Sequence, residues 1–284
     1  MTSFFFGKID GKLEAPRSVK EWGVKSEYWL CFEKVTGLVL TGSGLLHAHG
    51  GSWWSSVPSS SRPTALRFGG CNNLLYNGLT QRDSPSNHIK IIGCTNATLS
   101  NLHIIAPGNS PNTDGIDIAD SHNIHILSSS IKTGDDCVAI IGSSSDINIT
   151  RVGCGPGHGI SVGSLGKGGT LGRVQNVNVR HCTFYESLSA ARIKTWSATA
   201  VKVSDVTFRD FRGTSTDTLA ININCDRGIG CDNILMEHIN ITSSSPRTRL
   251  TAFCRFAHVI SRFVSISIRC VSRDEDSRSP SPLP

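Results

Sequence analysis

Charged residues are scarce in this sequence of 284 residues: Asp, Glu, Lys and Arg make up only 18% of it, whereas 38% is hydrophobic. That hydrophobic share is enough for a buried core, which excludes intrinsic disorder for most of the chain. The sequence lacks any run of about 18 apolar residues, the length that crosses a bilayer as a helix, so we expect no membrane association. It also opens without the apolar stretch of a secretory signal peptide.

A helical hydrophobic period is absent between residues 70 and 245, whereas 28 glycines and ten cysteines are present. Many turns and many cysteines together favour a secreted β-protein. The net charge of +6 would suit nucleic acid, an acidic lipid surface or a polyanionic carbohydrate. However, seven Arg face three acidic residues from Pro246 onward, so residues 1–245 carry only +2. The overall charge therefore does not select a partner.

A repeat of 22 residues begins near residue 88. Alternating β-branched pairs recur at Ile116 and Ile118, at Val138 and Ile140, and at Ile160 and Val162. A second series, in which Asn or Asp opens an alternating segment, occupies residues 123–126, 146–149, 176–179 and 233–236. Alternation predicts strands, and a sandwich or barrel has no reason to keep one motif at a fixed period. The sequence therefore predicts an all-β fold, a right-handed parallel β-helix, with residues 1–87 as less regular coils.

Four polar clusters occupy equivalent places in this repeat. They are Asn112-Thr113-Asp114, Gly134-Asp135-Asp136, Gly157-His158-Gly159 and Arg192-Ile193-Lys194. The first three follow one another at the period of the repeat, and a Gly-rich insertion at 163–169 accounts for the longer interval from His158 to Arg192. Because a solenoid stacks residues one period apart, we expect these side chains to line one face.

The chemistry of this face follows from its charges. Repulsion among three carboxylates should keep a proton within the cluster, which provides the acid and the base that glycoside hydrolysis requires. Arg192 and Lys194 suit an anionic substrate group. Since neighbours in a strand point to opposite faces, Asp135 and Asp136 can share a cleft only if their segment bends or bulges.

Each cluster also has a plainer interpretation. Asp114-Gly115 is a common turn pair, and the other Gly-flanked segments could be solvated corners. Asp135-Asp136 could suggest Ca²⁺, but such a site takes about six to eight oxygens and the neighbours here are His, Arg and Lys. We therefore expect neither a metal nor a cofactor, and the four clusters in one order favour a catalytic site.

In these four clusters the chain resembles glycoside hydrolase family 28, the pectin-degrading polygalacturonases, and among them the plant enzymes. The similarity extends from about residue 28 to about residue 243. It implies a cell-wall enzyme that hydrolyses α-1,4 bonds of homogalacturonan with inversion. A catalytically impaired pectin-binding β-helix and a rhamnogalacturonan hydrolase are the alternatives. We expect a monomer that binds pectin and does not bind nucleic acid.

The resemblance assigns roles to single residues. Asp135 would be the general acid, Asp114 and Asp136 would hold and activate the attacking water, and His158 would tune the acid. The substrate-binding residues would be Arg192, Lys194, Asn112 and Gly159. It also suggests the disulfides Cys137–Cys154 and Cys225–Cys231, for which buried free thiols are the alternative.

The chain also departs from the family. His47-Ala48-His49 stands where the family usually has an Asp-Gly pair, and we expect an N-terminally truncated β-helix over residues 1–243. About two coils that would follow residue 196, with a substrate-contacting Tyr, are expected to be missing. Residues 244–284 are rich in Arg and Ser and show no strand period, which predicts a disordered tail.

Overall fold

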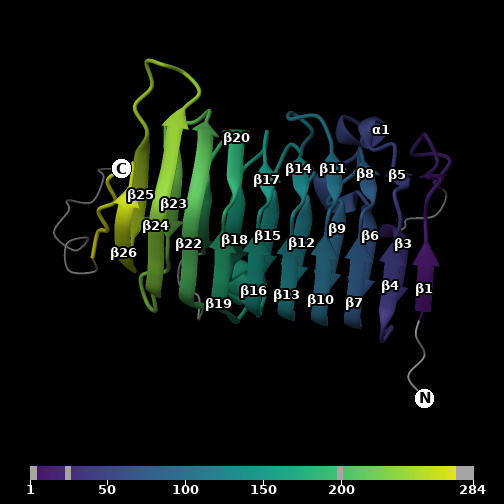
Figure 1. Ribbon diagram of the computed structural model, residues 1–284, viewed down its shortest axis with the longest axis horizontal. Coiled ribbons are helices and arrows are strands. Elements are labelled where there is room, and N and C mark those ends of the chain that lie inside the picture. The colour runs from purple at the N-terminus through teal and green to yellow at the C-terminus, as the bar shows by residue number, and fades with distance from the viewer. Residues whose placement is uncertain (1–4, 23–26, 197–200, 273–284) are drawn as a thin grey trace.

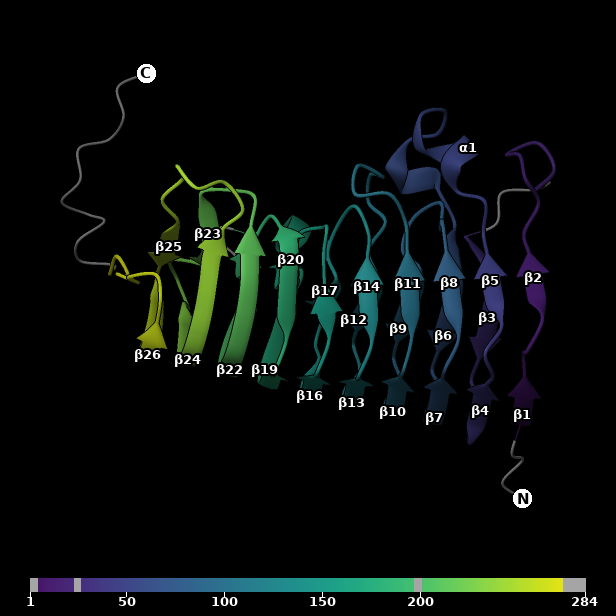
Figure 2. The same cartoon turned by 45° about the horizontal axis from the view of Figure 1, so that its top comes forward.

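The computed structural model describes residues 5–22, 27–196 and 201–272. Strands stack as successive coils along one long axis, from the N-terminal end to the C-terminal end (Figures 1 and 2). All pairings between these strands are parallel, which confirms the predicted parallel β-helix. Among the described residues α1 (Gly51–Trp54) is the only α-helix, and none of their helices is long and apolar enough to cross a membrane.

Two sheets contain the strands. The nine-stranded sheet comprises β3 (Tyr28–Glu33), β6 (Thr64–Gly69), β9 (Ile89–Ile92), β12 (Ile116–Ala119), β15 (Val138–Ile141), β18 (Ile160–Leu165), β21 (Ala191–Thr195), β23 (Leu219–Asn224) and β25 (Thr251–Arg255). The 17-stranded sheet contains two rows. The first row is β1 (Phe5–Lys8), β4 (Leu38–Thr41), β7 (Asn72–Asn77), β10 (Thr95–Ser100), β13 (His122–Leu127), β16 (Ser145–Thr150), β19 (Gly172–Arg180), β22 (Val201–Ser215), β24 (Cys231–Ser243) and β26 (Ala257–Val264). The second row is β2 (Lys12–Glu14), β5 (Leu45–His47), β8 (Thr80–Arg82), β11 (His103–Ile105), β14 (Ser130–Lys132), β17 (Gly153–Cys154) and β20 (Thr183–Ser187), and the short helices are η1 (Ser59–Ser61) and η2 (Lys167–Gly169).

The core is a set of apolar columns inside the coils. Ile116 pairs with Val138, which pairs with Ile160, and all three are fully buried. The next inward position repeats the pattern with Ile118, Ile140 and Val162. Each such side chain contributes about 2 kcal/mol through burial. The predicted 22-residue period therefore holds for the coils from Ile116 to Ile160, whereas the paired positions Ile89 and Ile116 are 27 residues apart and Ile160 and Ala191 are 31 apart.

The second repeating motif is an amide ladder on the outside of the first row. Its members all adopt φ between 51° and 57°, a left-handed conformation that Asn and Asp tolerate better than most residues. They are Asn73, Asn96, Asn123, Asp146, Asn176, Asp205 and Asn233. Asn123 Nδ2 donates to Asn96 Oδ1 at 2.8 Å, and Asn96 Nδ2 donates to Asn73 Oδ1 at 3.2 Å. The ladder fixes the bend that starts each of these strands.

The structure differs from the predicted disordered tail over residues 251–264. Here β25 pairs with β23 and β26 pairs with β24, so both sheets continue beyond residue 243. The physical reason is that a few apolar side chains, such as Val259 and Val264, pack against the core, while Ser261 and Arg262 are exposed. Residues 273–284 lie outside the described residues, as do residues 197–200, where the loss of coils was predicted.

Candidate active site

Asp114, Asp136 and His158 lie one above another in successive coils. Each precedes its strand by two residues, and the strands β12, β15 and β18 begin at Ile116, Val138 and Ile160, which pair with one another. The turns are also joined by the backbone, since the Gly115 amide donates to the Asp136 carbonyl at 2.8 Å. The constant spacing in the sequence therefore corresponds to real stacking at these three positions.

The segment before β15 bends, as the adjacent aspartates require. Residues 134 and 135 form a bend, and the strand begins only at Val138. As a result one carboxylate oxygen each of Asp135 and Asp136 and one nitrogen of His158 lie within 4.8 Å of one another. The disulfide Cys137–Cys154 follows directly after Asp136 and ties this turn to β17. The disulfide Cys225–Cys231 is also present, as expected, and a third, Cys254–Cys270, was not predicted.

Asp135 is held by polar neighbours. His158 Nδ1 lies 2.7 Å from Asp135 Oδ1, and Asn112 Nδ2 donates to Asp135 Oδ2 at 3.3 Å. Burial raises the pKa of Asp135, but the hydrogen bond and charge of His158 outweigh it, so the pKa lies below its usual value. The substrate-free protein therefore favours Asp135 as an anion.

Asp136 forms a compact network with Ser161 and Arg192. Ser161 Oγ donates to Asp136 Oδ1 at 2.8 Å and accepts from Arg192 Nε at 2.9 Å, while Arg192 Nη2 contacts the same carboxylate oxygen. Burial raises the pKa of Asp136, and the charges of Arg192 and Lys194 oppose that rise. The guanidinium thus lies directly against a catalytic candidate.

The prediction that Arg192, in the fourth cluster, occupies the place equivalent to His158 is wrong. Arg192 pairs with Ser161, three residues beyond His158, and not with His158. The first residue of β21, Ala191, pairs with Ile160, so the coil between these two residues is longer than the coil before it. Because insertions in the preceding loop lengthen the chain without moving the strand, counting residues could not fix the register.

Sequence reasoning missed Ser161 and Asp117. Asp117 lies on the ladder that continues through Ala139, Ser161 and Arg192. Burial and the nearby carboxylates raise the pKa of Asp117 to about 7, and burial together with Asp117 raises that of Asp114 well above its usual value. The position of Asp117 in the sequence could have indicated it. Asp117 follows Asp114 by three residues and occupies an outward-facing position of an alternating strand.

Toward the N-terminal coils, the row of paired residues that contains Asp117 continues with basic residues. Asp117 pairs with Lys90, which pairs with Arg67. Both basic residues line a cavity of 750 Å³, together with Asn87, whose side-chain amide donates to Asp117. Further residues that line this cavity are Trp22, Tyr28, Trp53 and Arg62. A basic cavity thus adjoins the aspartate cluster along one sheet.

Comparison with known proteins identifies the family. The sequence model of the glycosyl hydrolases family 28 matches residues 7–210 and 197–260. The chain belongs to this family. Over 84% of its length it is 39% identical to a probable polygalacturonase of Arabidopsis thaliana, and over 88% it is 33% identical to polygalacturonase-2 of Solanum lycopersicum. The chain spans 61% and 65% of these two relatives.

Solved structures of other proteins share the fold. The polygalacturonase from Erwinia carotovora ssp. carotovora superimposes with a TM-score of 0.72 at 21% identity, covering 90% of this chain and 77% of that one. The endo-xylogalacturonan hydrolase from Aspergillus tubingensis gives a TM-score of 0.68 at 24% identity, covering 94% and 84%. At these identities the likeness concerns the β-helix.

Gly159 and the tryptophans of this family member have different surroundings. Gly159 adopts φ +82°, and a Cβ there would meet the Ser189 carbonyl oxygen at 1.9 Å, so this position requires glycine. Trp53 is buried and packs edge-on against Trp22. Trp196, the residue after β21, is 50% exposed.

Proposed function

We propose that this protein is a polygalacturonase that hydrolyses the α-1,4 bonds of de-esterified pectin with inversion at the anomeric carbon. The observation that carries the proposal is the contact between Asp136 and Arg192, bridged by Ser161. This contact places a carboxylate of the kind needed for glycoside hydrolysis beside a cation that suits a sugar carboxylate. Family membership and the relatives named polygalacturonase give independent support.

In this reaction Asp135 donates a proton to the leaving glycosidic oxygen. Asp114 and Asp136 hold and activate the water that attacks from the opposite face. His158 hydrogen-bonds to the acid and tunes it, and Arg192 and Lys194 bind the substrate carboxylate. Asn112 contributes its amide, and Gly159, beside His158, allows the backbone of the next coil to pack closely at Ser189.

Substrate binding itself prepares the acid. The charge of Arg192 lowers the pKa of Asp135, and the charges of Arg192 and Lys194 lower that of Asp136. A galacturonate carboxylate that pairs with these cations weakens their effect, and the sugar also removes water from the site. Both changes raise the pKa of Asp135 toward the working pH, so protonation follows binding.

The basic cavity beside Asp117 accommodates further galacturonate units. Lys90 and Arg67 supply cations on paired strands one coil apart, and Arg62 and Tyr28 also line the cavity. A polyanionic chain can therefore extend from the cleavage point toward the N-terminal coils. We assign the protein to the extracellular cell wall because three disulfides suit an oxidising compartment. We expect it to act as a monomer.

A reducing-sugar assay on polygalacturonate tests this function. The wild type should release reducing ends, and D135N should lower kcat about 100-fold or more, because it removes the transferable proton. The matched control is D146N in the amide ladder, where Asn already occupies the equivalent positions 96 and 123, and it should keep wild-type activity. Substrate binding without turnover by the wild type would instead support the impaired pectin-binding β-helix, and turnover of rhamnogalacturonan alone would support the other alternative.

A further inference from the structure

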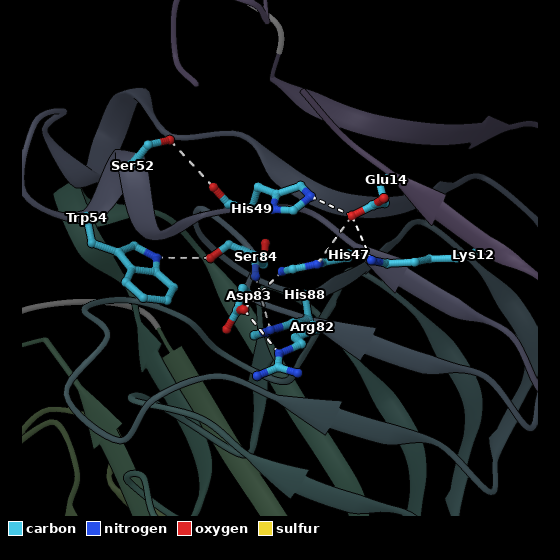
Figure 3. A network of polar contacts seen from close by, with 10 residues as sticks. All are labelled: Lys12, Glu14, His47, His49, Ser52, Trp54, Arg82, Asp83, Ser84 and His88. Atoms are coloured by element: carbon cyan, nitrogen blue, oxygen red, sulfur yellow. Dashed lines mark hydrogen bonds and ion pairs between the residues drawn. The ribbon is translucent and has the colours of Figure 1, made fainter. Parts of the chain in front are cut away.

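A second cluster of titratable side chains lies outside the catalytic cluster, in the N-terminal coils (Figure 3). Its members come from three stacked strands and the residues that follow them. Glu14 ends β2, His47 ends β5 and pairs with Glu14, and Asp83 follows β8. His49 lies two residues after His47. Because β5 pairs with β8 and β8 with β11, this cluster is two coils from the strand that leads into Asp114.

Three potential ligand atoms converge in this cluster. Glu14 Oε1 lies 3.0 Å from His49 Nε2 and 3.8 Å from His47 Nδ1, and the two imidazole centroids are 3.8 Å apart. In a tetrahedral site with bonds of about 2.0 to 2.1 Å, ligand atoms are about 3.3 Å from one another. The observed spacing therefore suits one bridging ion with only small side-chain movements.

A further carboxylate orients one of the histidines. His47 Nε2 lies 3.1 Å from Asp83 Oδ2, so the ring donates its Nε2 proton to Asp83 and leaves the Nδ1 lone pair facing Glu14. Such a carboxylate behind a ligating histidine fixes the tautomer and strengthens the ligand.

Basic residues compete for the same carboxylates. Lys12 Nζ lies 2.8 Å from Glu14 Oε1, and Arg82 Nε lies 3.3 Å from Asp83 Oδ2. The side chain of Lys12 is 48% exposed, so an entering cation can displace it into water. Arg82 contacts only the outer carboxylate and does not need to move.

We propose that Glu14, His47 and His49 bind one divalent transition-metal ion of the zinc class, with Asp83 orienting His47. Imidazole and carboxylate ligands suit Zn²⁺, Ni²⁺ and Cu²⁺, whereas Ca²⁺ prefers a shell of oxygens. The ion joins the coil of β2 to the coil of β5 and, through Asp83, to the coil of β8. It therefore stabilises the N-terminal part of the stack and takes no part in hydrolysis.

Titration of the full chain with Zn²⁺ tests the site, and Co²⁺ provides a visible spectrum. The wild type should bind one ion with the absorption bands of nitrogen and oxygen ligation. E14Q, H47A and H49A should each weaken binding at least 10-fold, and D83N should weaken it about 10-fold. K12M should tighten binding, because it removes the competing ammonium. E14Q is nearly isosteric and keeps the test decisive if a histidine variant misfolds.

Two controls separate this site from others. H258A removes an exposed histidine that also faces a carboxylate, Asp232, at 3.3 Å, and should bind Zn²⁺ like the wild type. H158A removes the histidine of the catalytic cluster, which also brings its ligand atoms within 4.8 Å, and should leave the affinity unchanged. A loss in H158A with none in H49A would overturn the proposal, as would the absence of Zn²⁺ binding by the wild type.

Thermal unfolding gives a readout that is independent of activity. Zn²⁺ should raise the Tm of the wild type as its concentration passes Kd, and the rise should disappear in H49A and E14Q. An equal rise in these variants, with native circular dichroism spectra, would show that the ion binds elsewhere and would contradict the assignment.

Discussion

Individual carboxyl groups in the active site differ in the free energy they contribute to folding. Asp117 is buried, and its pKa rises to about 7, because burial and the neighbouring carboxylates disfavour its anion. Between about pH 4 and about pH 7 the folded protein therefore holds a proton at Asp117 that the unfolded chain has released. Since the folded state binds more protons in this window, Asp117 lowers the stability as the pH rises.

We predict that D117N reduces this loss of stability at rising pH. The amide stays neutral at every pH, and its oxygen can still accept the hydrogen bond from Asn87. Relative to the wild type, D117N should gain on the order of 3 kcal/mol of unfolding free energy between pH 4 and pH 7. Urea unfolding at several pH values measures this difference. Parallel stability curves for the two proteins would show that Asp117 titrates normally in the folded state.

The sequence predicted the carboxylates of the site but missed Ser161 and Asp117, for a physical reason. Asp114, Asp136 and His158 stand in turns with distinctive Gly neighbours at a constant spacing. Ser161 and Asp117 stand inside strands, where a polar residue at alternate positions is expected on any solvent-facing surface. Only the register between strands reveals that Ser161 bridges Asp136 and Arg192.

At the scale of elements, the amide ladder links a sequence motif to backbone geometry. Asn123 adopts φ 55°, donates to Asn96 and accepts from His125 Nε2 at 3.0 Å. A left-handed conformation costs an ordinary residue about 1 to 2 kcal/mol, and Gly adopts it freely. In each coil where it occurs, the motif therefore indicates a bend in the backbone as well as a strand.

We predict that N123A destabilises the protein by about 2 kcal/mol, through a lost hydrogen bond and the strained backbone. N123G loses the same hydrogen bonds without that strain and should cost about 1 kcal/mol less. Urea unfolding of both variants separates the two contributions. If N123G proves as unstable as N123A, the side-chain hydrogen bonds would account for the whole effect and the backbone argument would fail.

At the scale of the whole molecule, the stack continues further than the sequence indicated. By composition residues 244–284 resemble a disordered segment, because Arg, Ser and Pro outweigh the apolar residues. Strand pairing depends on backbone hydrogen bonds and on a few inward side chains, and β25 and β26 obtain both from β23 and β24. Composition averaged over the whole of 244–284 hides two short strands of this kind.

A solenoid should confine damage to the coil in which it occurs, because each coil contacts only its neighbours. Two disulfides close loops of nearly equal length, 17 residues for Cys137–Cys154 and 16 for Cys254–Cys270, and so should stabilise to a similar extent, about 3 kcal/mol each. They differ in place, since the first adjoins Asp136 and the second lies in the coil of β25, two coils beyond β21.

We predict that the double variant C137S/C154S lowers kcat/KM on polygalacturonate more than 10-fold, because the turn that carries Asp135 and Asp136 loosens. C254S/C270S should keep kcat/KM within about twofold while lowering the unfolding free energy by a similar amount. Activity assays at a temperature where both variants remain folded, checked by circular dichroism, measure the contrast. An equal loss of activity in the two variants would mean that strain travels along the stack, and the coils would then act as one cooperative unit.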